Sequence, residues 1–401
     1  MSLNMTTFEA ALKQVYTSDR IENMVYKDNA FLALVPKMES FGGENLKLPI
    51  KFGIPQGGSI TFANAQANKT NSQLKAFLLT RIKDYALASI DNETIEASKG
   101  NSNAFMEAAT VEIDGAIELA TRSLATSIFR NGSGSIGQSL GSYTSTSLTL
   151  KNIDDIVNFE VGMTLVFSTA DGTGSIKTGT ALVDGVDRNL GVITLHAALT
   201  SIDGTSGVAA NDYIFRQGDY GGKISGIQSW IPNSAPSSAT FFGVDRTADV
   251  SRLAGQRFDG SALPIEEALI KAAALVAREG GAPDYCFMGY TKYAELVNAL
   301  GSKVFITKEA KPGIGFQGVL VNGPRGPISV IPDQNCPSDR AFMLSMQYWK
   351  LYSLGKCPKI LDTDGLKMLR DSSSDSVEVR IGYYAQLGCR APGFNCNIQL
   401  V

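Results

Sequence analysis

Residues 42–62 read GGENLKLPIKFGIPQGGSITF, and this segment gives the clearest indication of the fold. Apolar and polar side chains alternate strictly in its first half, which is typical of a β-strand with one exposed face. Residues 63–73 are small and polar, as in a mobile loop tip, and a return arm runs over residues 77–90. A two-stranded ribbon of this length is only marginally stable alone in water. The sequence therefore predicts a long projection that lies on another surface, in this chain or in a second copy. The alternating apolar positions are Leu46, Leu48, Ile50 and Phe52.

The ribbon leads into the strongest helical pattern of the chain, in residues 92–130. Apolar side chains recur every three or four positions from Met106 to Ile128, so they form one continuous stripe. Acidic residues precede the arginines along the polar face, an order that matches the helix macrodipole. Asn131-Gly132 then ends the helix. We expect a stripe ~33 Å long, followed by a glycine- and serine-rich linker over residues 131–142.

Beyond this linker the sequence changes to short alternating segments separated by turn residues. Residues 143–217 therefore read as a compact all-β insertion of ~70 residues, the size of a small domain. The strands predicted within it are 148–150, 163–167, 180–186 and 192–195.

The rest of the chain alternates helices and strands, which makes the predicted fold class α+β with projections. Pro264 stands at the first helical position of a helix that begins with two glutamates and ends at Gly280-Gly281. A second helix is expected at 292–300. No internal repeat of fixed period is present. The strands predicted here are 284–288, 328–331, 342–346, 349–354 and 377–387.

Composition excludes several classes of function. The 401 residues carry 36 Lys+Arg and 39 Asp+Glu, for a net charge of −3, which argues against a dedicated nucleic-acid binder. A single histidine rules out a histidine-rich metal site. The longest apolar runs are far shorter than the ~20 residues that span a bilayer, and the N-terminus has no signal-peptide pattern. We expect a soluble protein made in a cytoplasm, with no membrane partner.

The five cysteines support a reducing compartment. Their number is odd, no two form C-x-x-C, and none lies in the first 285 residues, so neither a disulfide framework nor a zinc site is predicted. They are Cys286, Cys336, Cys357, Cys389 and Cys396.

Four motifs resemble catalytic, cofactor-binding or metal-binding sites, and each is better explained as part of an ordinary turn, loop or strand. Residues 313–318 spell G-x-G-x-x-G, but the helix that a dinucleotide site requires does not follow. Ser139 lies in a G-x-S-x-G sequence without the strand-to-helix turn of a nucleophile elbow, and His196 lies in an alternating strand. Asp362-Thr-Asp364-Gly365 lacks the later ligands of a calcium loop and reads as a hairpin turn. The sequence thus predicts no catalytic, cofactor-binding or metal-binding residue, and no enzyme.

Three groups of residues carry a resemblance to a known family. The first is Asn29–Lys37 with Phe41-Gly-Gly43 and the alternating strand, and the second is the ribbon that returns into Asp91 before the long helix. The third is the C-terminal pattern from Trp349 to Asn395. This order of elements resembles the major capsid proteins of tailed bacteriophages with the HK97-type fold. The resemblance covers the chain except the insertion at about 143–217.

The resemblance implies a division of the chain into parts. The carboxyl-terminal part would return to the sheet of the peripheral domain, and the insertion would be an outward-facing accessory domain. The parts are an N-terminal arm (1–40), an extended loop or β-hairpin (41–91), the spine helix of the peripheral domain (92–142), an inserted small β domain (143–219), further peripheral domain (220–262), an axial domain (263–340), and the peripheral-domain sheet with the C-terminus (341–401).

The resemblance also implies a function. The chain would assemble with itself into pentamers and hexamers of an icosahedral shell that encloses double-stranded phage DNA without sequence-specific contacts. It would be found in the virion capsid after assembly in the host bacterial cytoplasm. Because the sequence starts directly at the arm, a separate scaffolding protein is expected, together with a portal and a decoration protein.

Some alternatives stay open at this point. The same fold serves encapsulin-like nanocompartment shells, and the β insertion could belong to a tail or decoration adhesin. An enzyme that uses Ser139 and His196 is a further hypothesis. Some members of the capsid family crosslink a lysine to an asparagine of a neighbour, but no partner motif accompanies the loop lysines, so we predict no crosslink. Those lysines are Lys47, Lys51, Lys69 and Lys75.

Overall fold

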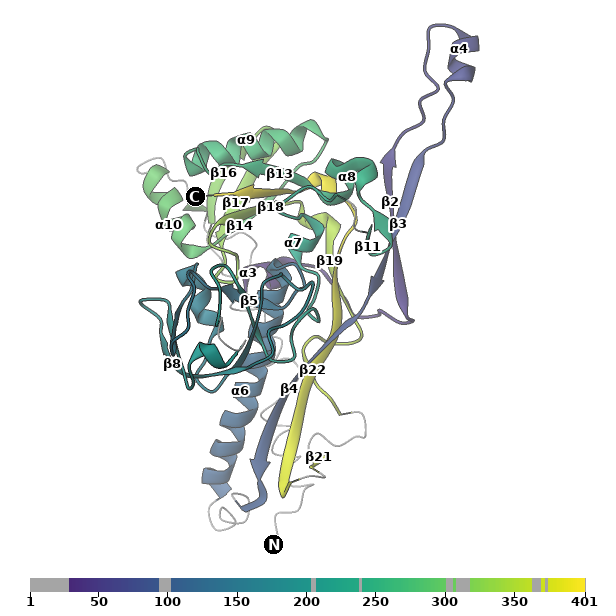
Figure 1. Ribbon diagram of the computed structural model, residues 1–401. Coiled ribbons are helices and arrows are strands. Elements are labelled where there is room, and N and C mark those ends of the chain that lie inside the picture. The colour runs from purple at the N-terminus through teal and green to yellow at the C-terminus, as the bar shows by residue number, and fades with distance from the viewer. Residues whose placement is uncertain are drawn as a thin grey trace.

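The computed structural model describes residues 29–93, 102–202, 207–237, 240–300, 306–307, 318–362, 369–371 and 374–400. Most of the predicted N-terminal arm, the G-x-G of residues 313–315 and the Asp364-Gly365 turn lie outside these ranges. Figure 1 shows a body built on two sheets, a long helix beneath it, a third sheet at its side and a hairpin that projects away. Among the described helices, none is long and apolar enough to cross a bilayer.

A seven-stranded mixed sheet forms the upper part of the body in Figure 1. Helices α9 (Ile265–Arg278) and α10 (Tyr290–Leu300) pack on it and bury Leu269, Val276 and Leu296. Pro264 proves to be the N-cap residue of α9 rather than its first helical residue. The strand order is β13 (Gln256–Asp259), β23 (Cys396–Gln399), β18 (Arg340–Leu344), β14 (Tyr285–Met288), β17 (Gly326–Pro332), β16 (Gly318–Gly323) and β15 (Ile306–Thr307).

A six-stranded sheet forms the second layer and is built around the 14-residue strand β22 (Ser376–Cys389). β22 pairs with β4 (Ile82–Asp91) along the whole length of β4. The predicted long helix is confirmed as α6 (Ser102–Phe129), and its apolar face packs on β4 and β22. The remaining strands are β1 (Lys37–Met38), β19 (Trp349–Ser353), β20 (Lys359–Ile360) and β21 (Leu369–Arg370).

The C-terminal region divides between the two sheets, unlike the prediction for residues 341–401. β18 and the last strand, β23, lie in the seven-stranded sheet, where β23 also pairs with β13 from the segment predicted as peripheral. The alternation of a strand shows which of its faces is buried but not which sheet it joins. Only long-range pairing decides that.

The predicted ribbon is present but differs in its return arm. β2 (Asn45–Gly53) pairs with β3 (Gln73–Thr80), with Leu48 opposite Phe77. The return arm does not continue as one strand to residue 90, because after Thr80 the chain enters β4 and joins β22 instead. The tip is also not an irregular loop throughout, since its alanines favour a short helix, α4 (Phe62–Ala67).

A third sheet of six strands lies beside α6 and has an apolar core of its own. The four predicted strands are confirmed as β6 to β9. The predicted linker 131–142 is wrong, because residues 135–138 form β5, which pairs with a strand that was not predicted, β10. The order is β5 (Ser135–Gln138), β10 (Tyr213–Arg216), β7 (Thr164–Ser168), β8 (Ala181–Asp187), β9 (Val192–Leu195) and β6 (Ser147–Thr149).

Short elements connect these layers. The small helices are α3 (Ala30–Leu34), α7 (Ile227–Trp230) and α8 (Val250–Ala254), and a two-stranded hairpin joins β11 (Thr240–Phe241) to β12 (Val244–Asp245). α3 places Phe31 in the main core against Phe129, Phe287 and Trp349. Short 3₁₀ helices lie at Ile153–Asn158, Leu199–Ser201, Thr247–Asp249, Met346–Tyr348 and Pro392–Phe394.

Candidate assembly surface

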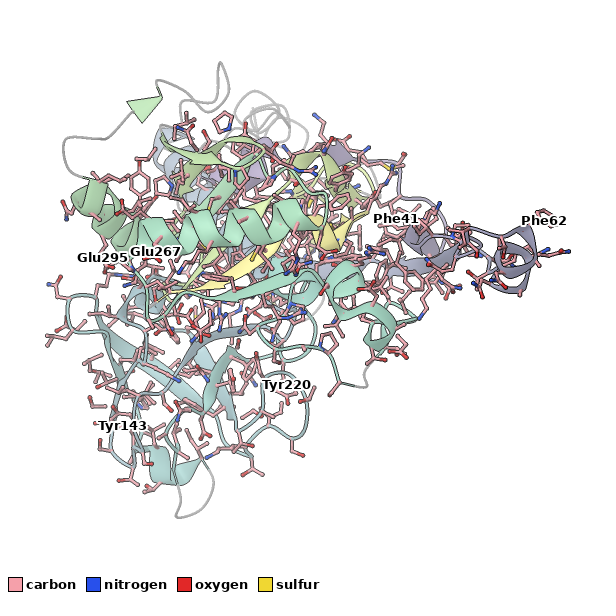
Figure 2. The ribbon with its side chains drawn as sticks, turned by 90° about the horizontal axis from the view of Figure 1, so that it is seen from above. Phe41, Phe62, Tyr143, Tyr220, Glu267 and Glu295 are labelled. Atoms are coloured by element: carbon pink, nitrogen blue, oxygen red, sulfur yellow. The ribbon has the colours of Figure 1, made fainter. Side chains whose placement is uncertain are left out.

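The hairpin β2–β3 carries apolar side chains into solvent. Figure 2 shows Phe41 near its root and Phe62 at its far end, away from the body. The exposed fractions of Ile60 and Phe62 are 103% and 84%, and Ile54 and Leu74 are also exposed. Uncovered apolar groups of this kind on a projection mark an interaction surface.

The hairpin is also uniformly basic. Residues 45–80 contain four lysines, no arginine, and no aspartate or glutamate. Since the whole chain has a net charge of −3, the rest of it carries −7. Sequence reasoning noted the lysines but missed the absence of carboxylates, a signal that a charge count over this segment would have found.

The root of the hairpin is fixed to the body. Phe77 is fully buried, and its ring centroid lies 5.0 Å from that of Trp230 in an edge-on contact. On the other strand, the Arg252 guanidinium donates a hydrogen bond to the carbonyl oxygen of Phe52, at 2.8 Å. A fixed root and an uncovered tip give the hairpin a defined direction in which to reach another molecule.

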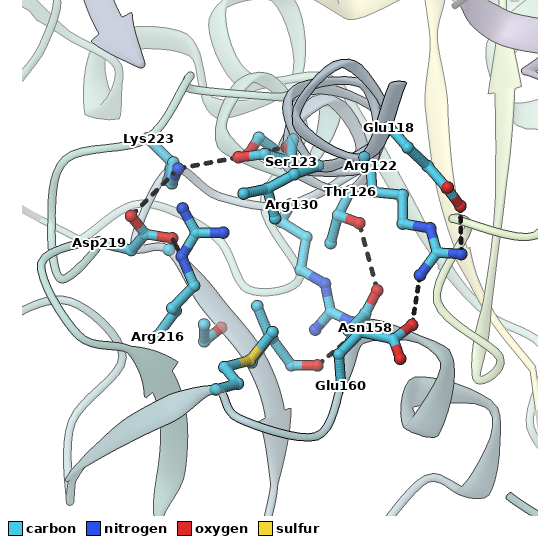
Figure 3. Close-up of a pocket in the computed structure, with 18 residues that line it drawn as sticks. Glu118, Arg122, Ser123, Thr126, Arg130, Asn158, Glu160, Arg216, Asp219 and Lys223 are labelled. Atoms are coloured by element: carbon cyan, nitrogen blue, oxygen red, sulfur yellow. Dashed lines mark hydrogen bonds and ion pairs between the residues drawn. The ribbon is translucent and has the colours of Figure 1, made fainter. Parts of the chain in front are cut away.

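A cavity of about 490 Å³ lies between α6 and the third sheet (Figure 3). Arg122 spans its rim, with ion pairs of 2.6 Å to Glu118 and 2.5 Å to Glu160. On the opposite side Arg216 pairs with Asp219 at 3.5 Å. These charges neutralise one another, so the cavity does not present a set of convergent groups for catalysis.

A buried charge cluster holds β4, α6, β22 and the segment after β10 together. The Lys223 ammonium lies 2.7 Å from Asp84 Oδ2 and 3.2 Å from Asp219 Oδ1. Asp84 Oδ2 also accepts hydrogen bonds from the hydroxyls of Ser123, at 2.5 Å, and Tyr383, at 3.0 Å. Sequence reasoning missed this cluster because its members are far apart in the chain.

The two carboxylates of the cluster have different pKa values. Burial alone would raise the pKa of Asp84, but the charge of Lys223 and three hydrogen bonds outweigh it, so the pKa lies below the usual value. For Asp219, burial raises the pKa more than the charges of Lys223 and Arg216 lower it, so the pKa lies above the usual value. Asp84 is therefore the main ionic partner of Lys223, and the cluster is a structural joint.

The structure does not bring the two candidate catalytic residues together. Ser139 is fully buried, and its hydroxyl donates to the carbonyl oxygen of Ala209 at 2.6 Å. His196 is exposed, and its Nδ1 lies 3.0 Å from a carboxylate oxygen of Asp184. Each side chain thus has a different partner. Within the described ranges, no group of three or more His, Cys, Asp or Glu side chains could hold a metal ion.

All five cysteines are buried and none forms a disulfide, so we expect them to resist alkylation in the folded protein. Burial raises the pKa of the Cys286 thiol to about 12, and the other four thiol pKa values are raised as well. Since the thiolate is the reactive form, N-ethylmaleimide at neutral pH should modify none of them, and all five should react in urea. Mass spectrometry counts the adducts, and modification of any cysteine in the native protein would contradict this packing.

Comparisons with known proteins find one family model and several solved structures that are similar to this chain. Residues 204–380 match the model of the family described as SU10 major capsid protein, whereas no curated protein matches the sequence significantly. A structure of the cyanophage A-1(L) capsid asymmetric unit shares the fold, with a TM-score of 0.53 and 13% identity over 93% of this chain and 92% of that chain. A structure from Mycobacterium phage Ogopogo has a TM-score of 0.44 and 10% identity over 93% of this chain and 92% of that one. The chain therefore has the fold of HK97-like phage capsid subunits, and its residues 204–380 are similar to the SU10 major capsid protein family.

Proposed function

We propose that this chain is a phage major capsid protein that forms pentamers and hexamers of an icosahedral shell, in which the hairpin of each copy lies over the adjacent copy. The main support for this proposal is the hairpin, which is fixed at its root and has exposed apolar side chains at its tip. Such a contact joins two different surfaces of the same chain. Heterologous contacts of this kind close into rings, which is the arrangement that a capsomer needs.

Charge complementarity supports the same contact. The hairpin is basic, and the rest of the chain is acidic. On α6, Glu112 and Glu118 are exposed, and Asp114 is half-buried between them. Opposite charges on two surfaces speed their encounter and orient it. A neighbouring copy therefore offers the kind of surface that the lysines of the hairpin require.

The shell would enclose double-stranded DNA without sequence-specific binding. Tight phosphate binding requires a strongly basic surface, and a net charge of −3 does not supply one. The protein would act as a structural subunit rather than an enzyme, in keeping with the separate partners of Ser139 and His196. We further propose assembly in the host cytoplasm with a scaffolding protein, a portal and a decoration protein, and without a lysine crosslink.

The parts of the chain would take the roles that the family resemblance implies. The seven-stranded sheet with α9 and α10 would form the axial domain around the capsomer axis. The six-stranded sheet with α6 would form the peripheral domain. Residues 135–216, with a sheet and a core of their own, would form the inserted accessory domain. No feature of the described residues favours a nanocompartment or an adhesin over this function.

Reversing two hairpin charges is expected to slow assembly. Lys47→Glu combined with Lys69→Glu replaces attraction by repulsion, so the assembly rate at low salt should fall about tenfold, and added salt should reduce the difference. Light scattering measures this rate. Lys151→Glu, at an exposed position of the domain proposed to face outward, is the control and should change the rate less. Equal rates for the hairpin variant and the wild type would contradict the proposed contact.

A further inference from the structure

The β11–β12 hairpin lies against the root of the projecting hairpin and contacts its outer strand. The backbone N–H of Leu78 in β3 donates to the carbonyl oxygen of Phe242 at 2.9 Å. The Lys75 ammonium donates to the carbonyl oxygen of Asp245, also at 2.9 Å. This contact stops near residue 75, and beyond it the two strands continue without a third element along that edge.

The turn between β11 and β12 has an unusual residue in a strained conformation. Phe242 and Gly243 have φ values of 46° and 77°, as in a two-residue turn where asparagine and glycine are the usual pair. A bulky residue with positive φ is a genuine outlier, and such strain persists where the surroundings over-determine it. The presence of phenylalanine at this strained position therefore indicates that its ring has a structural role.

The ring of Phe242 belongs to an aromatic cluster that also holds the hairpin root. Its centroid lies 4.4 Å from that of Phe241 and 5.7 Å from that of Trp230. Trp230 contacts Phe77 of β3 and donates its indole N–H to the carbonyl oxygen of Leu387 in β22, at 3.0 Å. One cluster thus joins the turn, the projecting hairpin and the sheet of the body.

A buried arginine locks this cluster in place. The guanidinium of Arg246 lies 4.3 Å from the ring centroid of Phe241 and donates to the carbonyl oxygens of Ser229, at 2.8 Å, and Trp230, at 3.4 Å. Its planar group both stacks and donates, which a lysine cannot reproduce. Only 8% of this arginine is exposed, so its position is fixed from all sides.

We propose that residues 240–246 form a brace that sets the direction in which the projecting hairpin leaves the body, with Phe242 and Arg246 as its positioning residues. The strained turn places its carbonyl oxygen on the outer edge of β3, and the ring and guanidinium hold the turn against Trp230. Without the brace, the hairpin root would keep the Phe77–Trp230 contact and the Arg252 bond to Phe52 but would lose its support along β3, so the hairpin would swing.

Phe242→Asn tests the brace because it keeps the turn and the carbonyl oxygen but removes the ring. In the unassembled protein, native-state hydrogen exchange at the Leu78 amide should become about tenfold faster, which equals ~1.4 kcal/mol, while the β4–β22 amides stay unchanged. Arg246→Lys should act in the same direction. Asn211→Gly is the matched control, since Asn211 also has positive φ, at 65°, but lies in the third sheet region.

A distance measurement then decides whether the brace sets direction. Spin labels on Asn64→Cys in α4 and Ala274→Cys in α9 report the angle between hairpin and body, because the native thiols are buried and unreactive. We expect a narrow distance distribution in the parent protein and a broad one with Phe242→Asn. Unchanged exchange at Leu78, or faster exchange with an unchanged distribution, would overturn the proposal.

Assembly gives a further readout that rests on the proposed function. Shells of the Phe242→Asn variant should lose their uniform diameter in electron micrographs, and shells as uniform as those of the wild type would contradict a role of the brace in assembly. Failure of the wild-type chain to form shells would instead contradict the proposed function. The exchange and distance measurements on the unassembled protein would still decide the brace.

Discussion

Replacing Lys223 by methionine is expected to lower the free energy of unfolding by about 3–5 kcal/mol. Lys223 is 6% exposed and lies between Asp84 and Asp219. The methionine fills a similar volume, so the loss comes from charge rather than from packing. Asp84 is left without its cation and Asp219 keeps only Arg216, and a largely buried charge without a partner costs far more than an exposed one. Urea denaturation at neutral pH measures the change.

The pH dependence of this loss separates charge from packing. In the wild type, the lowered pKa of Asp84 means that its contribution is present above its ordinary pKa and is lost as the pH falls below it. In the variant both carboxylates would have raised pKa values, so acid would stabilise it by protonating them. The difference between the two proteins should therefore shrink toward pH ~4.

Lys271→Met is the matched control for Lys223→Met. Lys271 pairs with Glu267 across one turn of α9, but both side chains are about half exposed. Exposed pairs of this kind contribute ~0.3–0.5 kcal/mol. If Lys223→Met lowered the free energy of unfolding as little as the control does, the charge cluster would not be what joins β4 to the segment after β10.

Placing aspartate at both Ile60 and Phe62 is expected to abolish shell assembly while leaving the fold intact. Both side chains are exposed in the single chain, so the change should shift the unfolding free energy by no more than ~0.5 kcal/mol. In the assembled shell, each aspartate would be a buried charge in an apolar contact. Sedimentation and electron microscopy should show subunits or small oligomers only.

Leu190→Asp is the matched control for the tip variant. Leu190 is 67% exposed in the turn between β8 and β9, in the domain proposed to face outward. This variant should assemble like the wild type. Normal shells from the tip variant would show that Ile60 and Phe62 stay exposed in the assembly.

Local periodicity accounts for the elements that the sequence predicts well. The apolar stripe of α6 and the alternation of β2 each require a neighbour on one face, and both elements are found where the pattern predicts them. For α9, the glutamates of the first turn and Gly280, with φ of 96°, correctly predict both ends. These signals are physical properties of single segments, so they can be read without knowledge of the fold.

Long-range pairing explains what the sequence does not predict. The alternation continues from β3 into β4, yet the two strands pair with different partners. β5 looks like a linker because glycines and serines surround it in the sequence. Gly137 leaves room there for the ring of Phe159, since a Cβ would lie 3.2 Å from that ring. Such constraints come from residues distant in the chain.

The candidate surface is predictable only in part. The projecting ribbon and its need for a second surface follow from the sequence, as does the likeness to phage capsid proteins. The joint at Lys223 and the brace at Phe242 do not, because each depends on contacts among segments far apart. Phe242-Gly243 also lacks the asparagine that would signal its turn.

Cryo-electron microscopy of the purified, assembled chain would show whether the projecting hairpin covers a neighbouring copy. We predict rings of five and six copies in a closed shell, with residues 54–72 of each copy over the adjacent copy and Ile60 and Phe62 covered by it. A monodisperse monomer at high concentration, or a shell in which this segment contacts only its own chain or solvent, would contradict it.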